Sequence, residues 1–393
     1  MKESLKKNSL PVIKTDACSC CSKKAVDLID LPQYPITEFY TDNPVSNNLY
    51  GFYDQKVLFC EDCAHLFLST IIDPDIIYNN YITSTNKSNG AVECLKNFES
   101  YILNSINLND YSSIIDIGGN DSTFLSFFGG DIENLINIDI NATAKSDNII
   151  LHKSSWEDVD FNQHNSQKPK IFTSSHTIEH LDSPIPFLEK ISKSMKANDV
   201  FYLQFPSLEL LVKEQRYDQL CHQHLNIFSL KSIGIALNQC NLYINSYEFD
   251  PSHFGTLRLK ISKIKNKILD FEIISKSSIL HSYVDFQDFY LKFGDSYKKI
   301  LADGQGFGAG LMVPTLAYNL PIINNLQVIY DQDRSKINKR FINLRPKIKD
   351  SKYMDITKPI IITAISTKAA TRSIFNYLSS NKFKKILIPT ITT

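Results

Sequence analysis

Short apolar runs alternate with stretches of helical periodicity through the middle of this chain. Apolar, β-branched runs of about four to eight residues are typical of buried strands. The runs that we expect to form strands are 113–117, 135–140, 149–152, 171–174 and 200–205. Helical patterns at 93–108 and 184–196 lie between or before these runs. Alternation of this kind predicts an α/β fold, in which helices cover a parallel sheet.

A second, smaller α/β unit is predicted towards the C-terminus. The run 257–262 alternates apolar and polar residues, as a half-exposed strand does. A helical pattern at 268–300 then leads to a glycine cluster at 304–310. Further strands are expected at 326–330 and 360–364. Because strands and helices alternate again, this part predicts its own sheet.

Length and charge narrow the class of protein. A chain of 393 residues has room for two or three domains, and we place them at 1–85, 86–265 and 266–393. With 42 basic and 42 acidic side chains the formal net charge is +0, so we expect a small substrate and no nucleic acid. No apolar stretch is long enough to span a bilayer, and segment 1–14 lacks a signal-peptide pattern. We therefore expect a cytoplasmic protein without a membrane partner.

A strand–turn–helix pattern at 114–125 predicts a nucleoside-binding loop. The apolar run ends in an acid, and two glycines follow, which let a backbone come close to a ligand. A second acid, Asp139, ends the next apolar run 23 residues after Asp116, where it can meet ribose hydroxyls. The loop lacks the glycine spacing of dinucleotide sites, so we expect it to bind S-adenosylmethionine (SAM). The residues expected to contact SAM here are Asp116, Gly118, Asn120, Ser122 and Asp139.

Four of the eight cysteines form two Cys-x-x-Cys pairs near the N-terminus. Cys18 with Cys21, and Cys60 with Cys63, could present four thiolates to one tetrahedral zinc ion. Such a site is structural, because no coordination position is left open. Cys20 leaves the choice within the first pair open, and a chance spacing of buried thiols is the alternative.

Two histidine-rich segments follow expected strand ends, where open α/β sheets place their ligands. The first contains His176 and His180, and the second contains His222 and His224. Imidazole can act as a base or an acid near neutral pH, which favours a catalytic role. Two other interpretations stay open. Either segment could ligate a metal through His-x-x-x-His or His-x-His, or the rings could satisfy polar groups in loops.

In their order along the chain, these landmarks resemble the zinc-containing C-methyltransferases that act on nucleotide-linked deoxy-keto-sugars. The segments that carry the resemblance are 60–63 with Tyr78 and Tyr81, 117–125, 217–230, 253–258 and 304–310. The resemblance covers nearly the whole chain. It implies an N-terminal zinc module, a Rossmann-like SAM domain and a C-terminal α/β domain that holds the nucleotide of the substrate.

The resemblance also implies a catalytic set. His224 matches the base that removes a proton beside the sugar ketone, and His180 matches a position that binds or polarises the sugar. In the segment of His224, Cys221 stands where the family has a tyrosine and Gln223 where it has a glutamate. His222 lies between these two and completes the expected set.

Further residues are expected to contact SAM. By the resemblance, Tyr78 and Tyr81 close over its methionine end, and packing between modules is the alternative. Trp156 lies near the expected adenine wall, with core packing as its alternative. His176, at its strand end, is placed with the cofactor, and Ser122 stands where the family has a glycine.

The expected function is methyl transfer from SAM to a carbon of a nucleotide-activated sugar. Because Cys221 and Gln223 replace a phenol and a carboxylate, two alternatives stay open. The same fold and site could catalyse O-methylation or epimerisation, or the chain could bind a nucleotide sugar without catalysis. The sequence does not define the sugar, the nucleotide or the oligomeric state.

Overall fold

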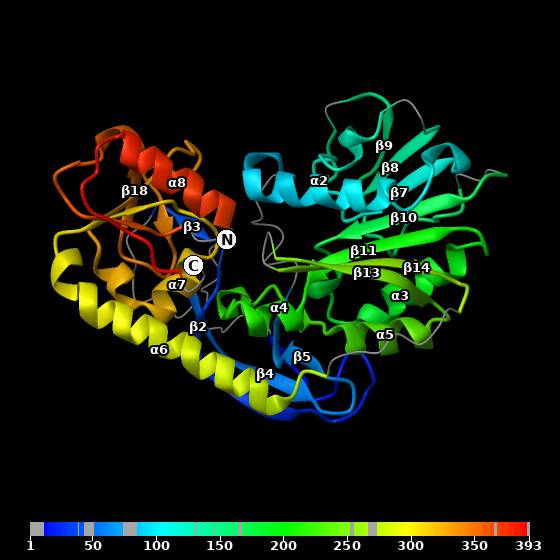
Figure 1. The fold of residues 1–393 in the computed structure, drawn as a ribbon, viewed down its shortest axis with the longest axis horizontal. Helices are drawn as coiled ribbons and strands as arrows, with labels where there is room; N and C mark the ends of the chain where they lie inside the picture. Colours follow the sequence, from blue (N-terminus) through cyan, green and yellow to red (C-terminus); the bar gives the residue numbers. More distant parts are fainter. Residues whose placement is uncertain are drawn as a thin grey trace, which may run out of the picture.

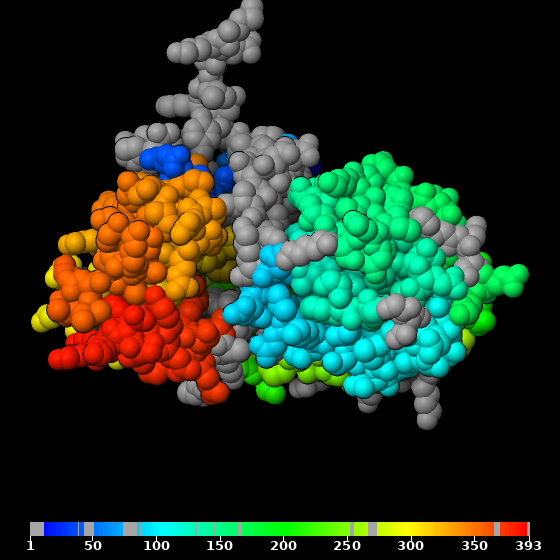
Figure 2. All heavy atoms as spheres, turned by 90° about the horizontal axis from the view of Figure 1, so that it is seen from above, coloured from blue at the N-terminus to red at the C-terminus, as the bar shows by residue number. Residues whose placement is uncertain are grey.

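Three groups of elements make up the structure, a computed structural model. It describes residues 12–37, 39–42, 51–73, 85–129, 132–144, 146–163, 167–251, 255–265, 273–364 and 368–390. The N-terminal strands (blue) lie at the base of Figure 1, between a central lobe (cyan to green) and a C-terminal lobe (yellow to red). Figure 2 shows these two lobes side by side from above. The predicted α/β class is confirmed. Within the described ranges, no helix is both long and apolar enough to cross a membrane.

The central lobe contains a seven-stranded sheet with the order β13-β14-β11-β10-β7-β8-β9. Its strands are β7 (Ser113–Ile117), β8 (Asn134–Ile138), β9 (Ile149–His152), β10 (Lys170–Ser175), β11 (Val200–Pro206), β13 (Tyr243–Asp250) and β14 (Thr256–Ser262). All neighbouring strands are parallel except β14, which is antiparallel to both β11 and β13. The strand order reverses between β7 and β10, so a ligand is expected beyond the carboxyl ends of these two strands.

Helices cover both faces of this sheet (Figure 1). α2 (Asn89–Leu103) packs on one face, where Phe98 shares a core with Ile114 of β7. α3 (Pro184–Ser194) and α5 (Leu230–Gln239) pack on the other, where Phe187 shares a core with Ile115. Alternate residues of a buried strand face opposite sides, which explains why β7 is apolar throughout. α2 begins after Ser88, whose side chain accepts from the backbone N–H of Ala91.

The helix that was expected after the glycine loop is not formed. Only a 3₁₀ turn, η4 (Leu125–Phe127), occurs among the described residues there. Asp121 accepts hydrogen bonds from the backbone N–H of Thr123 (3.2 Å) and from its hydroxyl (2.6 Å). A local turn of this kind competes with helix formation, and Gly129 with Gly130 follows immediately. The apolar residues Phe124, Leu125 and Phe128 are therefore buried in the hydrophobic core without forming an α-helix.

The N-terminal unit shares strands with both lobes. Its sheet has the order β12-β5-β4-β2. These strands are β2 (Val26–Pro35), β4 (Phe52–Cys60), β5 (His65–Leu68) and β12 (Asn226–Ile227). A two-stranded ribbon joins β3 (Tyr40–Thr41) to β17 (Arg340–Phe341), and another joins β1 (Val12–Lys14) to β6 (Thr70–Ile72). Because β12 and β17 lie beyond residue 85, the division at that residue stays a prediction.

The C-terminal lobe holds a five-stranded parallel sheet with the order β18-β16-β15-β19-β20. These strands are β15 (Gln305–Phe307), β16 (Val328–Asp331), β18 (Lys347–Asp350), β19 (Ile360–Ile362) and β20 (Ile386–Leu387). The helices around it are α6 (Lys276–Leu301), α7 (Val313–Asn319) and α8 (Lys368–Ser380). α8 approaches α2 across the gap between the ribbons of the lobes (Figure 1), and α4 (Leu208–Lys213) contacts α6.

Candidate active site and metal centre

Four cysteine thiols converge in the N-terminal unit. Cys18 and Cys21 lie before β2, Cys60 ends β4, and Cys63 lies in the turn before β5. The four Sγ atoms lie within 4.8 Å of one another, and three of the pairs are 3.5 Å apart. Sulfurs about 2.3 Å from a tetrahedral zinc ion are separated by about 3.8 Å, so this set fits zinc. Cys20 is not part of the set.

The cysteine cluster is tied to the central lobe. The carbonyl oxygen of Cys20 accepts from Nε2 of Gln239 at the end of α5 (2.6 Å). His65 is fully buried, and its Nε2 lies 3.2 Å from Oγ of Ser19 and 3.1 Å from Oδ1 of Asn226 in β12. The buried cysteines also share one hydrophobic core with the central sheet. The cluster therefore supports the domain beside it.

Two glycines allow the loop after β7 to pack closely. Gly118 has a φ of +81°, and a Cβ there would lie 2.1 Å from Oγ1 of Thr177. A Cβ on Gly119 would lie 2.4 Å from Oδ1 of Asn137 in β8. Both contacts are shorter than real side chains tolerate, and the first position also needs left-handed backbone. The loop is thus fixed against β8 and the turn after β10.

Asp139 holds the same loop from the end of β8. Its Oδ2 accepts from the backbone N–H of Asn120 (3.0 Å) and its Oδ1 from that of Asn141 (2.7 Å). Each oxygen keeps a further lone pair, which a ribose hydroxyl can use. Ser122 is buried, and its hydroxyl donates to the carbonyl oxygen of Thr143 (2.6 Å). The Ser122 side chain therefore shapes the loop and leaves ligand contact to its backbone.

Asp116 is a buried carboxyl group at the end of β7, with 2% of its surface exposed. Burial raises the pKa of Asp116 from the ordinary 3.8 to about 7. The negative charge of Asp139 also raises this pKa, whereas a hydrogen bond from Thr173 lowers it. Oγ1 of Thr173 donates to Oδ1 of Asp116 (2.8 Å). The group therefore changes charge near neutral pH, directly beneath the expected SAM loop.

Asp116→Asn should stabilise the ligand-free protein, and more at pH 8 than at pH 5. Above the unfolded pKa the unfolded chain has lost this proton while the folded protein retains it, so stability falls as the pH rises to about 7. A pKa raised from 3.8 to about 7 corresponds to at most about 4 kcal/mol. Urea unfolding at both pH values measures the gain, with the exposed Asp110→Asn as control. An equal gain at both pH values would contradict the expected charge change.

One histidine from each segment meets at the strand ends. The ring centroids of His180 and His224 lie 5.1 Å apart, with an angle of 64° between the planes. Nδ1–H of His180 donates to the carbonyl oxygen of Gln223 (2.8 Å), which leaves Nε2 of the neutral ring as an acceptor. Burial lowers the pKa of His180 to about 4, so the ring is neutral near neutral pH.

Glu179 forms a buried ion pair beside these rings. Its Oε1 accepts from Nδ1 of His176 (3.2 Å) and lies 4.0 Å from Nε2 of His180. Burial opposes the charge on both partners of the pair. Nevertheless, Cys94 and Glu179 raise the pKa of His176 to about 10, and His176 lowers the pKa of Glu179. A carboxylate is therefore held next to His180.

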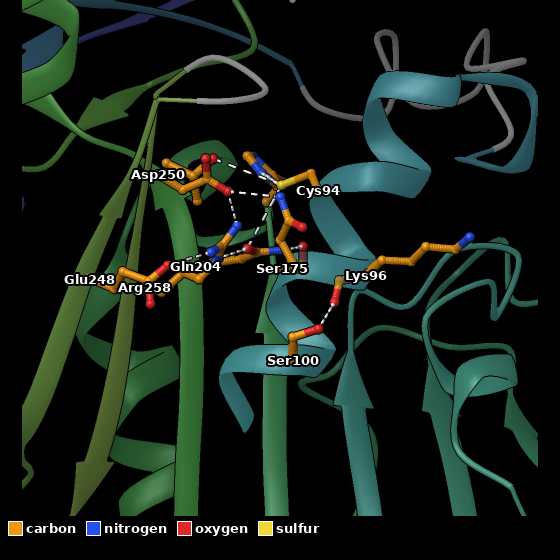
Figure 3. Close-up of polar contacts among 11 residues, drawn as sticks. Cys94, Lys96, Ser100, Ser175, Gln204, Glu248, Asp250 and Arg258 are labelled. Atoms are coloured by element: carbon orange, nitrogen blue, oxygen red, sulfur yellow. Dashed lines mark hydrogen bonds and ion pairs between the residues drawn. The ribbon is translucent and has the colours of Figure 1, made fainter. Parts of the chain in front are cut away.

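A polar network that includes Cys94, Gln204 and Arg258 surrounds Ser175 at the end of β10 (Figure 3). Sγ of Cys94 lies 3.8 Å from Nε2 of His176 and 3.8 Å from Oε1 of Gln204. Nε2 of Gln204 donates to Oγ of Ser175 (2.7 Å). The main-chain carbonyl oxygen of Gln204 accepts from the backbone N–H of His176 (3.0 Å). Arg258, 2% exposed, donates to Oε1 of Gln204 (3.4 Å) and pairs with two carboxylates of β13. The network thus holds the backbone at His176.

The side chains of His222 and Gln223 point into the N-terminal unit. Nε2–H of His222 donates to the carbonyl oxygen of Tyr34 (3.1 Å), and burial lowers the pKa of His222 to about 4. Oε1 of Gln223 accepts from the hydroxyl of Thr37 (2.9 Å). Cys221 is also buried, with 3% of its surface exposed. Of the five residues expected to be catalytic, the structure brings together only the rings of His180 and His224.

The aromatic residues expected at SAM have other surroundings. The half-buried ring of Trp156 packs edge-to-face on Phe187 of α3, at 5.2 Å between centroids. Trp156 thus shows the core packing that was its alternative role in the sequence analysis. Tyr78 and Tyr81 lie outside the described residues.

Four further residues belong to the site although they were not expected there: Glu179, Cys94, Gln204 and Arg258. A signal was available for Glu179, because it stands between His176 and His180 in the same segment. Cys94 lies on α2, Gln204 on β11 and Arg258 on β14, and only the tertiary fold brings these three together.

Comparison with known protein families gives one match for the central lobe and one for the N-terminal segment that contains the four cysteines. Residues 92–247 match the family model "Methyltransferase domain", and residues 18–78 match "Putative zinc binding domain". The C-methyltransferase NovU of Streptomyces niveus is 19% identical over 257 residues. That match covers 62% of this chain and 59% of NovU, so it spans less than two thirds of this relative.

Solved methyltransferase structures are similar at a low level. The 1,6-didemethyltoxoflavin-N1-methyltransferase of Burkholderia thailandensis is 9% identical and gives a TM-score of 0.39, covering 57% of this chain and 100% of that one. The magnesium protoporphyrin IX methyltransferase of Synechocystis PCC 6803 is 10% identical, with a TM-score of 0.34 and 44% and 84% of the two chains covered. The two domain matches, together with the sheet order and the four-cysteine cluster, identify a methyltransferase domain in the central lobe of this chain and a zinc-binding domain at its N-terminal end.

Proposed function

We propose that this protein transfers the methyl group of SAM to the carbon beside the ketone of a nucleotide-linked deoxy-keto-sugar. The observation that carries the proposal is the meeting of His180 and His224, whose ring centroids lie 5.1 Å apart on the segments that follow β10 and β11. The two rings come from segments that are separated in sequence and joined by the fold. An acid–base pair at this edge of the sheet is where the chemistry of such a domain is expected.

In this proposal His224 is the base. Its imidazole takes the proton from the carbon beside the ketone, and the carbanion so formed is the nucleophile for the methyl group. Bound SAM supplies that methyl group as an electrophile. Nε2 of His180 is an acceptor in the neutral ring, so it suits a sugar hydroxyl. The buried side chain of Gln223 accepts a hydrogen bond from Thr37. In this proposal the histidines therefore carry out both the proton abstraction and the binding of the sugar.

Asp139→Ala should weaken SAM binding by more than about tenfold. The carboxylate positions the loop through Asn120 and Asn141, and a hydrogen bond to a charged group contributes about 1.5–3 kcal/mol. Calorimetric titration with SAM measures the affinity. Asp147→Ala, at an exposed position after the same strand, is the matched control. An unchanged affinity would remove Asp139 from the cofactor site.

We further propose that the C-terminal lobe holds the nucleotide of the substrate. Its glycine turn repeats the contacts of the SAM loop. The backbone N–H of Gly308 donates to the carbonyl of Tyr330 (2.7 Å), as that of Gly118 donates to Ile138 (2.8 Å). Oδ2 of Asp331 accepts from the backbone N–H next to Gly308 (2.6 Å), as Asp139 does in its own loop. This repeated strand-end geometry supports a second nucleoside site.

The experiment that tests the proposed function is product analysis with thymidine- and guanosine-linked keto-sugars. We expect a product heavier by one CH₂, with the new methyl group on carbon by NMR. The buried positions of Cys221 and Gln223 favour O-methylation as the second candidate, because neither side chain is free to polarise a ketone. A methyl group found on oxygen would select that candidate. Binding without any change in mass would reject both.

A further inference from the structure

A cluster of three possible metal ligands lies outside the cysteine site. Glu179, His180 and His224 each offer one ligand atom, and these atoms lie within 4.8 Å of one another. The sequence suggested metal binding within one histidine segment or the other. The structure instead combines one histidine from each segment with the carboxylate that precedes His180, which supplies the third ligand.

One carboxylate oxygen of Glu179, Oε2, is buried without a hydrogen-bond partner among the described residues, and a cation could satisfy it. Glu179 is 1% exposed. Its Oε1 already accepts from Nδ1 of His176 (3.2 Å). Leaving a buried charged oxygen without a partner is costly, and native structures usually provide a donor, a water or an ion.

The surrounding contacts orient the ligands as metal sites do. Nδ1–H of His180 donates to the carbonyl oxygen of Gln223 (2.8 Å), which directs Nε2 towards the cluster. Nε2 lies 4.0 Å from Oε1 of Glu179, close enough for both residues to reach one ion with small side-chain movements. Histidines that bind metals commonly donate their other N–H to a backbone carbonyl or a carboxylate. His176 holds the carboxylate in the corresponding way.

We propose that Glu179, His180 and His224 bind a divalent transition metal ion, distinct from the zinc of the cysteine site. Two imidazoles and one carboxylate suit zinc, iron(II), cobalt(II) or nickel(II) better than calcium or magnesium. Three protein ligands leave coordination positions open, as they do in catalytic zinc sites, whereas four thiolates close the other site. The open positions would take an oxygen of a substrate, such as a ketone or a hydroxyl.

This site goes beyond the proposed function and does not depend on it. A metal bound to His224 engages a nitrogen lone pair that proton abstraction would need. The metal-loaded site would therefore offer an electrophile where the metal-free site offers a base. Metal binding and methyl transfer are measured separately, so the failure of one proposal leaves the other standing.

The test titrates cobalt(II) into the 393-residue chain, purified with zinc in its cysteine site. We expect one equivalent of cobalt to bind beyond the zinc, with a visible spectrum that lacks the thiolate charge-transfer band. Glu179→Gln and His180→Ala should each weaken this binding at least about 100-fold, and His176→Asn about 10- to 100-fold. Glu209→Gln, at a half-buried glutamate that accepts from the backbone N–H of Leu230, should bind as the wild type does.

Three results would overturn the site. These are no cobalt beyond the zinc, cobalt binding that survives unchanged in a folded Glu179→Gln or His180→Ala variant, or a thiolate band that assigns the cobalt to cysteine. Circular dichroism establishes that each variant is folded. His180 is 24% exposed in its side chain, so His180→Ala keeps the test decisive if Glu179→Gln does not fold.

Discussion

Cys63→Ser should remove the zinc from the N-terminal unit and lower the free energy of unfolding by at least about 3 kcal/mol. Sγ of Cys63 lies 3.5 Å from the sulfurs of both Cys18 and Cys21, so it is a central member of the ligand set. Structural zinc contributes about 10 kcal/mol or more to the folding of isolated zinc-finger peptides. Metal analysis and thermal unfolding measure the two effects.

The destabilisation should reach the methyltransferase domain. The cysteines share a core with the central sheet, and β12 joins the sheet of the zinc module directly after His224. We therefore expect SAM affinity and unfolding temperature to fall together. A chelator should produce the same result in the wild type, because it removes the metal without changing a residue.

Cys20→Ser is the matched control for this prediction. Cys20 lies in the turn between Cys18 and Cys21 and is as buried as Cys63, but its thiol is not one of the four that converge. It should retain one zinc per chain and most of its stability. Loss of zinc in Cys20→Ser with retention in Cys63→Ser would overturn the ligand assignment.

The parts of the fold that follow from local patterning could be predicted from the sequence. The buried strands of the central sheet are apolar on both faces, which makes them recognisable in the sequence. The Cys-x-x-Cys spacing places two thiolates where one zinc ion can bind both, so it predicts the metal site. The acid after β8 was likewise predictable, because a strand end fixes where Asp139 lies. The C-terminal glycine cluster also marks a strand end, at β15.

The direction of single side chains could not be predicted in the same way. His222 and His224 lie two residues apart, yet His222 is buried against Tyr34 while His224 faces His180. That difference depends on the N-terminal sheet, which reaches this segment only through long-range pairing with β12. The partnership of Glu179 with His224 likewise depends on the order of the strands. Local propensity carries no information on such contacts.

His224→Ala should lower the rate of methyl transfer about 100- to 10,000-fold, the range expected when a positioned base is lost. SAM affinity should stay within about twofold, because the cofactor loop lies on other strand ends. Product formation and calorimetry measure the two quantities. His281→Ala, at an exposed histidine on α6, is the matched control and should leave both unchanged. Equal turnover in His224→Ala and the wild type would exclude His224 as the base.

Exchange of the sugar proton separates a base from a metal ligand. Without SAM, a base at the ketone should still exchange the neighbouring proton for deuterium, because this half-reaction needs no methyl donor. His224→Ala removes both the base and a proposed metal ligand, whereas Glu179→Gln removes only a ligand and leaves the imidazole in place. If exchange is lost in His224→Ala and retained in Glu179→Gln, the imidazole itself moves the proton. If exchange is lost in both and cobalt binding is lost with it, the metal activates the ketone and His224 acts through the ion.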